Sequence, residues 1–413
     1  MNDRDPRYVI LVGDGMGDYA LPELGGRTPL DAARTPTLDR LAAIGRMGTL
    51  CTIPDGMEPG SDVANMSLLG YDPARYHTGR APLEAASLGI ALGPEDVAFR
   101  CNLVTLDQSG DGILRMGDYS AGHISTPEAH EIIQTLQSAT EGLPLTLYPG
   151  VSYRHLLVWT GGRDDLPTTP PHDITGQPTA QYAEVYESTP VLRTFVERAA
   201  ALLRSHPVNE RREAEAHRRA NAVWLWGQGR APSMPTLREK AGLTGAMISA
   251  VDLLKGLGVY AGLEAIAVPG ATGYLDTNYA GKVEAALQAL ETGNFVYMHI
   301  EAPDEAGHEG SLAKKVEAIE AFDERVVAPM VAGLKRFPRA RLLIVTDHMT
   351  PIAKRTHVTD PVPFLLVPDL GAVENSPTSN TVTFCEASGH AAGLHLGSGM
   401  ELLDLLLGSS PFA

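Results

Sequence analysis

Short, uninterrupted apolar runs recur near both ends of the chain. They occupy residues 8–12, 222–226, 245–250, 295–300, 341–345 and 363–367. Such runs, rich in branched aliphatic residues and without polar alternation, are typical of parallel strands whose sheet is covered on both faces. Segments with helical apolar spacing separate most of them, among them residues 35–44 and a helix that begins at Asn65. The pattern predicts an α/β fold with a mostly parallel sheet sandwiched by helices.

The pattern changes in the middle of the chain. From about residue 94, isolated strands at 99–106 and 156–160 alternate with helical and proline-rich segments. Residues 191–220, rich in Ala, Arg and Glu, predict amphipathic helices whose charged face is solvated. We therefore expect residues 94–222 to form a smaller, inserted α+β domain, and residues 1–93 and 223–413 to form the core domain.

Composition narrows the class of partner. With 413 residues, the chain is long enough for two or three domains. A net charge of −17 opposes nucleic acid and anionic membranes as partners, because both require a basic surface. No apolar run approaches the roughly 20 residues of a membrane span, and the first residues lack the apolar core of a signal peptide. We expect a cytoplasmic enzyme. If its substrate is an anion, the positive charge that binds it must be supplied locally, by metal ions or a few arginines.

Acidic and histidine residues follow three of the apolar runs. Asp14 follows residues 8–12, Asp304 and His308 follow 295–300, and Asp347 and His348 follow 341–345, with His357 close behind. Ligands of open α/β sheets lie beyond the carboxyl ends of the strands. Carboxylates and imidazoles together suit divalent Zn²⁺, Mn²⁺ or Co²⁺, and six ligands are too many for one such ion. The sequence therefore predicts a site for two metals.

Each motif alone has a simpler interpretation. Asp14 in Gly13-Asp-Gly-Met-Gly could be a turn residue, and the GxGxxG spacing of a dinucleotide loop is absent. Ser61, between Pro59-Gly60 and an apolar run, could be a turn residue and a helix N-cap. The joint occurrence at strand ends favours the metal site.

In combination the motifs resemble a known family. Gly13-Asp-Gly-Met-Gly, Gly60-Ser-Asp-Val-Ala-Asn, Ala302-Pro-Asp-Glu-Ala-Gly-His-Glu-Gly, Thr346-Asp-His and His357-Val-Thr-Asp-Pro-Val-Pro-Phe look like the archaeal-type, cofactor-independent phosphoglycerate mutases of the alkaline phosphatase superfamily. The resemblance runs from residue 8 to about residue 405, and includes Ser388-Gly-His-Ala-Ala-Gly-Leu. It implies an alkaline-phosphatase-like core domain with an inserted lid domain.

The resemblance also implies a mechanism. One metal would be held by Asp304, His308 and His357, and the other by Asp14, Ser61, Asp347 and His348. Ser61 would be the nucleophile, transiently phosphorylated while 3-phosphoglycerate and 2-phosphoglycerate interconvert, and the lid would keep water away. Mn²⁺ is the expected metal, with Zn²⁺, Co²⁺ and Mg²⁺ as alternatives. The small-molecule phosphoglycerate would be the partner, and 2,3-bisphosphoglycerate would not be needed.

Several basic and polar residues are candidates for contact with the substrate. The candidates are His123, Arg154, His155, His172, Asp173, Arg230 and Lys255, each with a surface or structural role as the alternative. His123, His172 and Asp173 are of a type that could carry protons. Asp62 is interpreted as a helix-capping residue, and His390 and His395 rank behind His357 as ligands.

Two other functions remain open from the sequence. A metal-dependent phosphatase or phosphodiesterase of the same superfamily would use the same metal ligands and nucleophile, and would differ in the fate of the phosphoserine. A non-catalytic metal-binding or scaffold relative is the alternative outside enzymes. The oligomeric state is not predicted.

Overall fold

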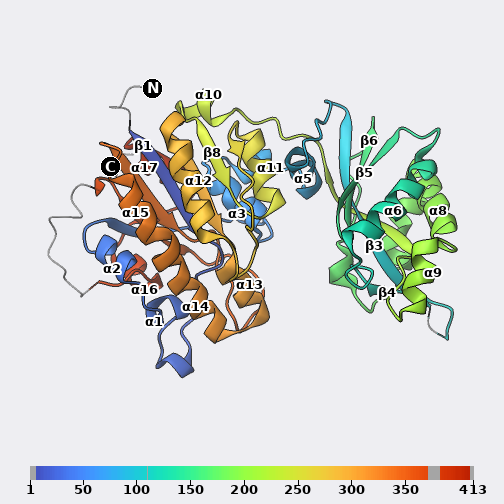
Figure 1. The fold of residues 1–413 in the computed structure, drawn as a ribbon, viewed down its shortest axis with the longest axis horizontal. Coiled ribbons are helices and arrows are strands. Elements are labelled where there is room, and N and C mark those ends of the chain that lie inside the picture. The colour runs from blue at the N-terminus through green and yellow to red at the C-terminus, as the bar shows by residue number, and fades with distance from the viewer. Residues whose placement is uncertain (1–5, 109, 371–381, 410–413) are drawn as a thin grey trace. The chain divides into compact units, whose positions relative to one another are not determined.

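The chain divides into two compact units. The computed structural model describes residues 6–108, 110–370 and 382–409. The first unit comprises Met1–His77 and Ser233–Ala413, and the second comprises Thr78–Pro232 (Figure 1). Among the described residues, no helix is both long and apolar enough to cross a membrane.

The first unit is built on an eight-stranded sheet, counted over the described residues, in the order β13-β2-β12-β11-β1-β10-β8-β9. Its strands are β1 (Arg7–Gly13), β2 (Arg46–Leu50), β8 (Gly245–Ile248), β9 (Glu264–Ala265), β10 (Phe295–Ile300), β11 (Ala340–Val345), β12 (Val362–Val367) and β13 (His395–Leu396). Only β12 runs antiparallel to its neighbours, and every other adjacent pair is parallel. The prediction of a mostly parallel α/β sheet is confirmed.

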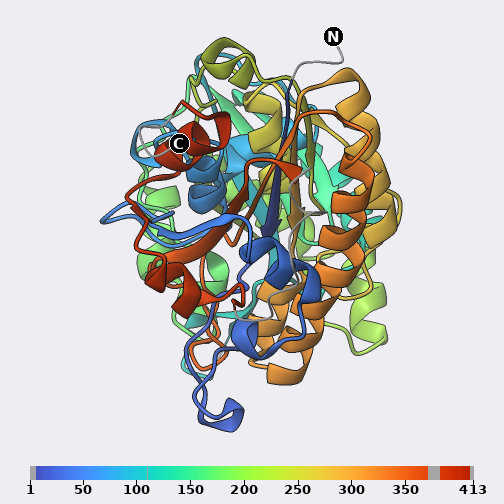
Figure 2. The same cartoon turned by 90° about the vertical axis from the view of Figure 1, so that its left-hand side faces the viewer.

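Helices cover both faces of this sheet (Figure 2). They are η1 (Pro22–Leu24), α1 (Pro29–Ala32), α2 (Pro36–Ala42), α3 (Ser61–Leu68), α4 (Pro73–Tyr76), α10 (Leu237–Ala241), α11 (Asp252–Tyr260), α12 (Tyr279–Thr292), α13 (Ala302–Glu309), α14 (Leu312–Phe322), the π-helix η4 (Asp323–Val327), α15 (Ala328–Leu334), α16 (Glu386–Ala391) and α17 (Gly399–Leu407). Val9 and Leu11 of β1 pack in one core with α12, α14 and α15, while α11 and α17 contact β8 and β11 and flank α3. Consecutive residues 9–12 are all fully buried, which explains the lack of polar alternation.

The second unit contains an antiparallel sheet of five strands within the part of the chain that is described. The strands are β3 (Asp96–Gln108), β4 (Leu114–Asp118), β5 (Leu145–Val151), β6 (Arg154–Thr160) and β7 (Ala222–Gly229). The helices are α5 (Arg80–Ser87), α6 (Thr126–Leu136), η2 (Gln137–Thr140), η3 (Pro171–Ile174), α7 (Ala180–Glu187), α8 (Pro190–Leu203) and α9 (Pro207–Ala214). Helices α6 and α8 share its main core, and α5 packs in a smaller cluster with Ala98 and Leu156.

The expected limits of the insertion, 94 and 222, fall inside this unit. Strand β7 was expected in the parallel sheet of the core domain, but it pairs antiparallel with β3. A buried apolar run shows that a strand is covered on both faces and does not show which sheet it joins. Helix α5 also belongs here, because it packs on β3 and β7 and its Glu84 pairs with Arg100 of β3 at 2.7 Å.

Candidate active site

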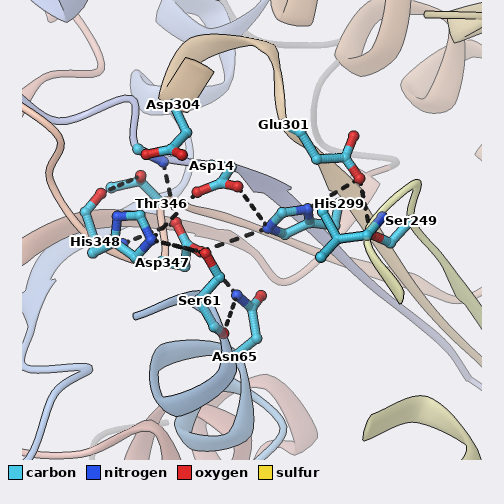
Figure 3. A network of polar contacts seen from close by, with 12 residues as sticks. Asp14, Ser61, Asn65, Ser249, His299, Glu301, Asp304, Thr346, Asp347 and His348 are labelled. Atoms are coloured by element: carbon cyan, nitrogen blue, oxygen red, sulfur yellow. Dashed lines mark hydrogen bonds and ion pairs between the residues drawn. The ribbon is translucent and has the colours of Figure 1, made fainter. Parts of the chain in front are cut away.

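The ends of three adjacent strands place the acidic residues together. Strand β1 pairs in parallel with β10 on one side and with β11 on the other, so their carboxyl ends meet at one edge of the sheet. Asp14 follows β1 and Asp347 follows β11. Helix α13 begins directly after β10, and Asp304 lies in its first turn. Figure 3 shows the three carboxylates facing one another.

Ser61 reaches the same place from α3. Gly60 precedes the helix in an extended conformation, and Ser61 is its first residue. The Ser61 side chain makes no capping hydrogen bond; its Oγ lies 3.1 Å from Nε2 of His348 (Figure 3). The turn expected at Pro59-Gly60 is not present, because Gly60 is extended. Gly60 is also the N-cap, and the serine hydroxyl points at a candidate metal ligand.

One candidate metal group is completely buried. Nε2 of His348 lies 3.4 Å from Oδ1 of Asp14 and 3.4 Å from Oδ2 of Asp347. The ligand atoms of these three residues all lie within 4.8 Å of one another. With Ser61 beside them, the structure brings together the four residues expected for one ion.

The other candidate group surrounds Asp304. Its Oδ2 lies 3.2 Å from Nε2 of His308, and its Oδ1 lies 3.5 Å from Nε2 of His357. The two histidine Nε2 atoms are 3.0 Å apart. His348 can join Asp304 and His357 around one ion, so it lies between the two groups.

The chemistry of these groups fits divalent cations. Among the described residues, Oδ1 of Asp14 is buried without a hydrogen-bond partner. Burial, followed by the charges of Asp347 and Asp304, raises the pKa of Asp14 well above its ordinary value. Buried carboxylates repel one another unless a cation or a proton lies between them, and imidazole nitrogens have the lone pairs that such a cation requires. The donor set is therefore suited to metal binding.

His299 was missed by the sequence analysis. It is fully buried in β10, 3.4 Å from Oδ2 of Asp14, 3.5 Å from Oδ2 of Asp347 and 3.4 Å from Oε1 of Glu301. Burial alone would lower its pKa, but the nearby carboxylates of Asp347 and Glu301 outweigh burial and raise the pKa to about 9. A polar residue inside the apolar run 295–300 was the signal that could have indicated it.

Asn65 was also missed as a site residue. It is fully buried in α3, and its Nδ2 donates to Oδ2 of Asp347 and to the carbonyl oxygen of Ser61, both at 2.8 Å (Figure 3). Its Oδ1 accepts from the hydroxyl of Tyr297 at 2.5 Å. The spacing of Ser61 and Asn65, four residues apart on a helix, was the available signal.

Asp62 is not the N-cap residue of α3. That position is held by Gly60, and Asp62 lies in the first turn. Instead, the buried Asp62 accepts from Nε2 of His77 at 2.8 Å.

Several expected substrate contacts gather in the second unit. The ring of Tyr153 lies 6.4 Å from that of His123 and 5.8 Å from that of Tyr119, and 5.9 Å from the guanidinium of Arg154. The ring of His172 lies 6.0 Å from that of Tyr119. Asp173 lies next to His172, with Oδ1 3.5 Å from its Nε2. The structure thus links His123, Arg154, His172 and Asp173 through two tyrosines.

Three other candidates lie outside that group. His155 is buried and accepts from the amide of Gly150 at 3.0 Å. Arg230 donates to Asp164 at 3.1 Å and to the carbonyl oxygen of Gly162 at 2.8 Å. Lys255 lies in the first unit, on α11, and pairs with Asp252 at 3.1 Å. Each of the three side chains therefore already forms a hydrogen bond or an ion pair with another residue of the protein.

Two curated relatives align with nearly the whole chain. The 2,3-bisphosphoglycerate-independent phosphoglycerate mutase of Methanothrix thermoacetophila is 53% identical over 402 residues, covering 97% of this chain and 99% of that protein. A Geobacter sulfurreducens protein named as a probable enzyme of the same kind is 50% identical over 401 residues, with 97% and 99% covered. The chain belongs to the 2,3-bisphosphoglycerate-independent phosphoglycerate mutases. The mutase class predicted from the motifs is confirmed.

Family and structure comparisons agree with this membership. The family model described as 2,3-bisphosphoglycerate-independent phosphoglycerate mutase matches residues 42–209. A solved structure of the cofactor-independent phosphoglycerate mutase of Thermoplasma acidophilum is 27% identical, with a TM-score of 0.64 and 98% and 99% of the two chains covered. A Pyrococcus horikoshii protein is 28% identical, with a TM-score of 0.81 over 98% and 97% of the chains. The fold is therefore shared with these proteins over nearly the whole length of the chain.

Proposed function

We propose that this mutase interconverts 3-phosphoglycerate and 2-phosphoglycerate through a phosphoserine on Ser61. The observation that carries the proposal is the position of the Ser61 hydroxyl, 3.1 Å from Nε2 of His348 and beside the buried Asp14 and Asp347. A serine hydroxyl is a poor nucleophile at neutral pH and needs an activating neighbour.

Two divalent metal ions are part of the proposal. Asp304, His308 and His357 would hold one, and Asp14, Ser61, Asp347 and His348 the other. The orphaned oxygen of Asp14 and the facing imidazole nitrogens of His308 and His357 support this assignment. When bound, such ions lower the pKa of the serine hydroxyl and neutralise charge on a phosphoryl group. We expect Mn²⁺, because carboxylate-rich sites with imidazole suit it.

The chain's own groups account for the bonds that change. Ser61 Oγ attacks phosphorus and loses its proton, the bond from phosphorus to the 3-oxygen of glycerate breaks, and that oxygen gains a proton. The glycerate then turns, its 2-oxygen attacks the same phosphorus and loses its proton, and the bond to Ser61 Oγ breaks. The serine recovers a proton, so the net change is a move of the phosphoryl group within the substrate.

The second unit would act as a substrate-binding lid. Its group of His123, Arg154, His172 and Asp173 offers a positive charge for a carboxylate or phosphate, and side chains that exchange protons. Three of these side chains contact Tyr119 or Tyr153, and Asp173 contacts His172, which supports a shared role. A lid is required because water must not reach the phosphoserine while glycerate turns. His155, Arg230 and Lys255 were also expected to contact the substrate, and we give them no part in this step because each has a structural partner.

The test follows product and free phosphate together. Purified protein with Mn²⁺ and 3-phosphoglycerate should form 2-phosphoglycerate with little phosphate released, and Ser61→Ala should form neither. Ser67→Ala is the matched control, because Ser67 lies on the same helix and accepts from the amide of Gly399 instead. Dominant phosphate release would identify a phosphatase, and full activity in Ser61→Ala would remove the phosphoserine from the mechanism.

A further inference from the structure

The hydroxyl of Thr350 connects the two proposed metal groups. Thr350 is fully buried and follows His348 by two residues. Its Oγ1 forms a hydrogen bond with Oδ1 of Asp304 and lies 3.2 Å from Nδ1 of His348. Asp304 belongs to one group and His348 to the other, so one hydroxyl contacts both.

A count of protons fixes the direction of these two bonds. An ionised carboxylate only accepts hydrogen bonds, so the single proton of the Thr350 hydroxyl goes to Asp304. The same hydroxyl can then only accept from His348, and Nδ1 of His348 must carry the proton. In a neutral imidazole, this leaves the lone pair on Nε2.

The lone pair is needed at Nε2. That atom faces Oγ of Ser61 at 3.1 Å, and carboxylate oxygens of Asp14 and Asp347 at 3.4 Å each. A proton on Nε2 would occupy the position where these groups converge, whereas a lone pair completes a set of donors for a cation.

The backbone holds Thr350 independently of its hydroxyl. Its amide donates to the carbonyl oxygen of Gly17 at 3.2 Å, and its carbonyl oxygen accepts from Nζ of Lys315 at 2.7 Å. A change of the side chain alone therefore leaves these two anchors in place.

We propose that Thr350 is a positioning residue that sets the tautomer of His348 and the orientation of Asp304, and so couples the two metal groups. The inference rests on the two-metal function proposed above. Outer partners of metal ligands affect metal affinity by roughly 10–100-fold when removed. Thr350 serves one ligand in each group, so its removal should weaken both.

The experiment compares Thr350→Val, which removes the hydroxyl at nearly constant volume, with Thr350→Ser, which keeps it. Mn²⁺ affinity and stoichiometry are measured by calorimetric titration of the metal-free proteins. Thr350→Val should bind Mn²⁺ roughly 10–100-fold more weakly, and Thr350→Ser should return close to the original affinity. Thr49→Val is the matched control: it removes another buried threonine hydroxyl, which lies 2.6 Å from Nδ1 of His395, a residue of neither candidate group. Unchanged affinity in Thr350→Val, or a loss in Thr350→Ser as large as in Thr350→Val, would overturn the inference.

A second measurement needs no variant. Nitrogen-15 NMR of the metal-free protein should find the proton of His348 on Nδ1, and a proton on Nε2 would overturn the inference even if Thr350→Val fails to fold. The proposed function is tested separately by the stoichiometry of the unaltered protein. Fewer than two Mn²⁺ ions per chain would count against the two-metal function. The position of the proton on His348 would still be decided by the NMR measurement.

Discussion

Nδ2 of Asn65 donates to Oδ2 of Asp347 at 2.8 Å, and joins the helix of the nucleophile to a carboxylate at the end of β11. The same amide group donates to the carbonyl oxygen of Ser61, so one side chain fixes the first turn of α3 relative to Asp347. Tyr297 of β10 donates to the other end of the amide. The position of Ser61 therefore depends on strands that lie far from it in the sequence.

Asn65→Leu should reduce both activity and stability. Leucine fits the volume, but it leaves Asp347 and the Tyr297 hydroxyl without this partner, and an unsatisfied buried polar group costs about 1–3 kcal/mol. We expect mutase turnover to fall by roughly 10–100-fold, as for other partners of metal ligands. Turnover and urea denaturation measure the two effects. If turnover is unchanged in Asn65→Leu, the Asn65 amide is not needed to position Ser61.

Gly15→Ala should weaken metal binding by displacing Asp304. Gly15 has a φ of +59°, and a Cβ there would lie 2.5 Å from Oγ1 of Thr350 and 2.6 Å from Oδ1 of Asp304. Gly25→Ala is the control, because Gly25 has a similar φ of +67° with no atom within 4 Å of the added carbon. Elemental analysis after dialysis should find metal lost only from Gly15→Ala. Equal metal content in both variants would show that the protein accommodates the added Cβ beside Asp304 without losing metal.

The acidic residues at the strand ends could be predicted from the sequence, whereas the buried residues that contact them could not. Asp14, Asp304 and Asp347 could be placed because an apolar run ends just before each, and parallel strands bring such ends together. His299 lies inside a run, so its neighbours on β1 and β11 depend on strand order, which the pattern does not contain. The same lack of strand order misplaced β7, whose apolar residues fit either sheet.

Lys315→Met should destabilise the first unit. Nζ of Lys315 is fully buried and donates to Oδ2 of Asp18 at 2.9 Å, and to the carbonyl oxygens of Gly17 and Thr350. Removing one partner of a buried pair typically costs about 3–5 kcal/mol, because the other charge stays buried. Far-UV circular dichroism during denaturation should show an earlier transition.

Lys314→Met provides the matched control for Lys315→Met. Lys314 is the preceding residue and pairs with Glu309 at the surface. Exposed pairs contribute little, so its denaturation midpoint should stay nearly unchanged. Equal effects of the two substitutions would contradict a structural role of the buried pair.

Asp304→Asn and His357→Ala should abolish mutase activity and lower the bound metal, while the fold is kept. Both residues lie in one candidate group, with Oδ1 of Asp304 3.5 Å from Nε2 of His357. Elemental analysis of purified proteins measures the metal, and circular dichroism checks the fold. His390→Ala is the control, because His390 is exposed and lies outside both groups. Unchanged metal content in Asp304→Asn would count against this residue as a ligand.

The second unit should lose stability on acidification, in part through His155. Burial, helped by the charge of His130, lowers the pKa of His155 to about 3, against about 6.5 in an unfolded chain. Between these two values the unfolded chain binds a proton that the folded unit does not, so the free energy of unfolding falls as the pH falls. Tryptophan fluorescence can report the unfolding of the second unit. The three tryptophans of the chain all lie in it: Trp159, Trp224 and Trp226. In His155→Asn, the amide oxygen can still accept from Gly150. The loss between pH 7 and pH 4.5 should be smaller by about 2.5 kcal/mol, since nearly two pH units lie between the unfolded pKa and pH 4.5, each worth about 1.4 kcal/mol. An equal loss in both proteins would mean that His155 takes up its proton without unfolding.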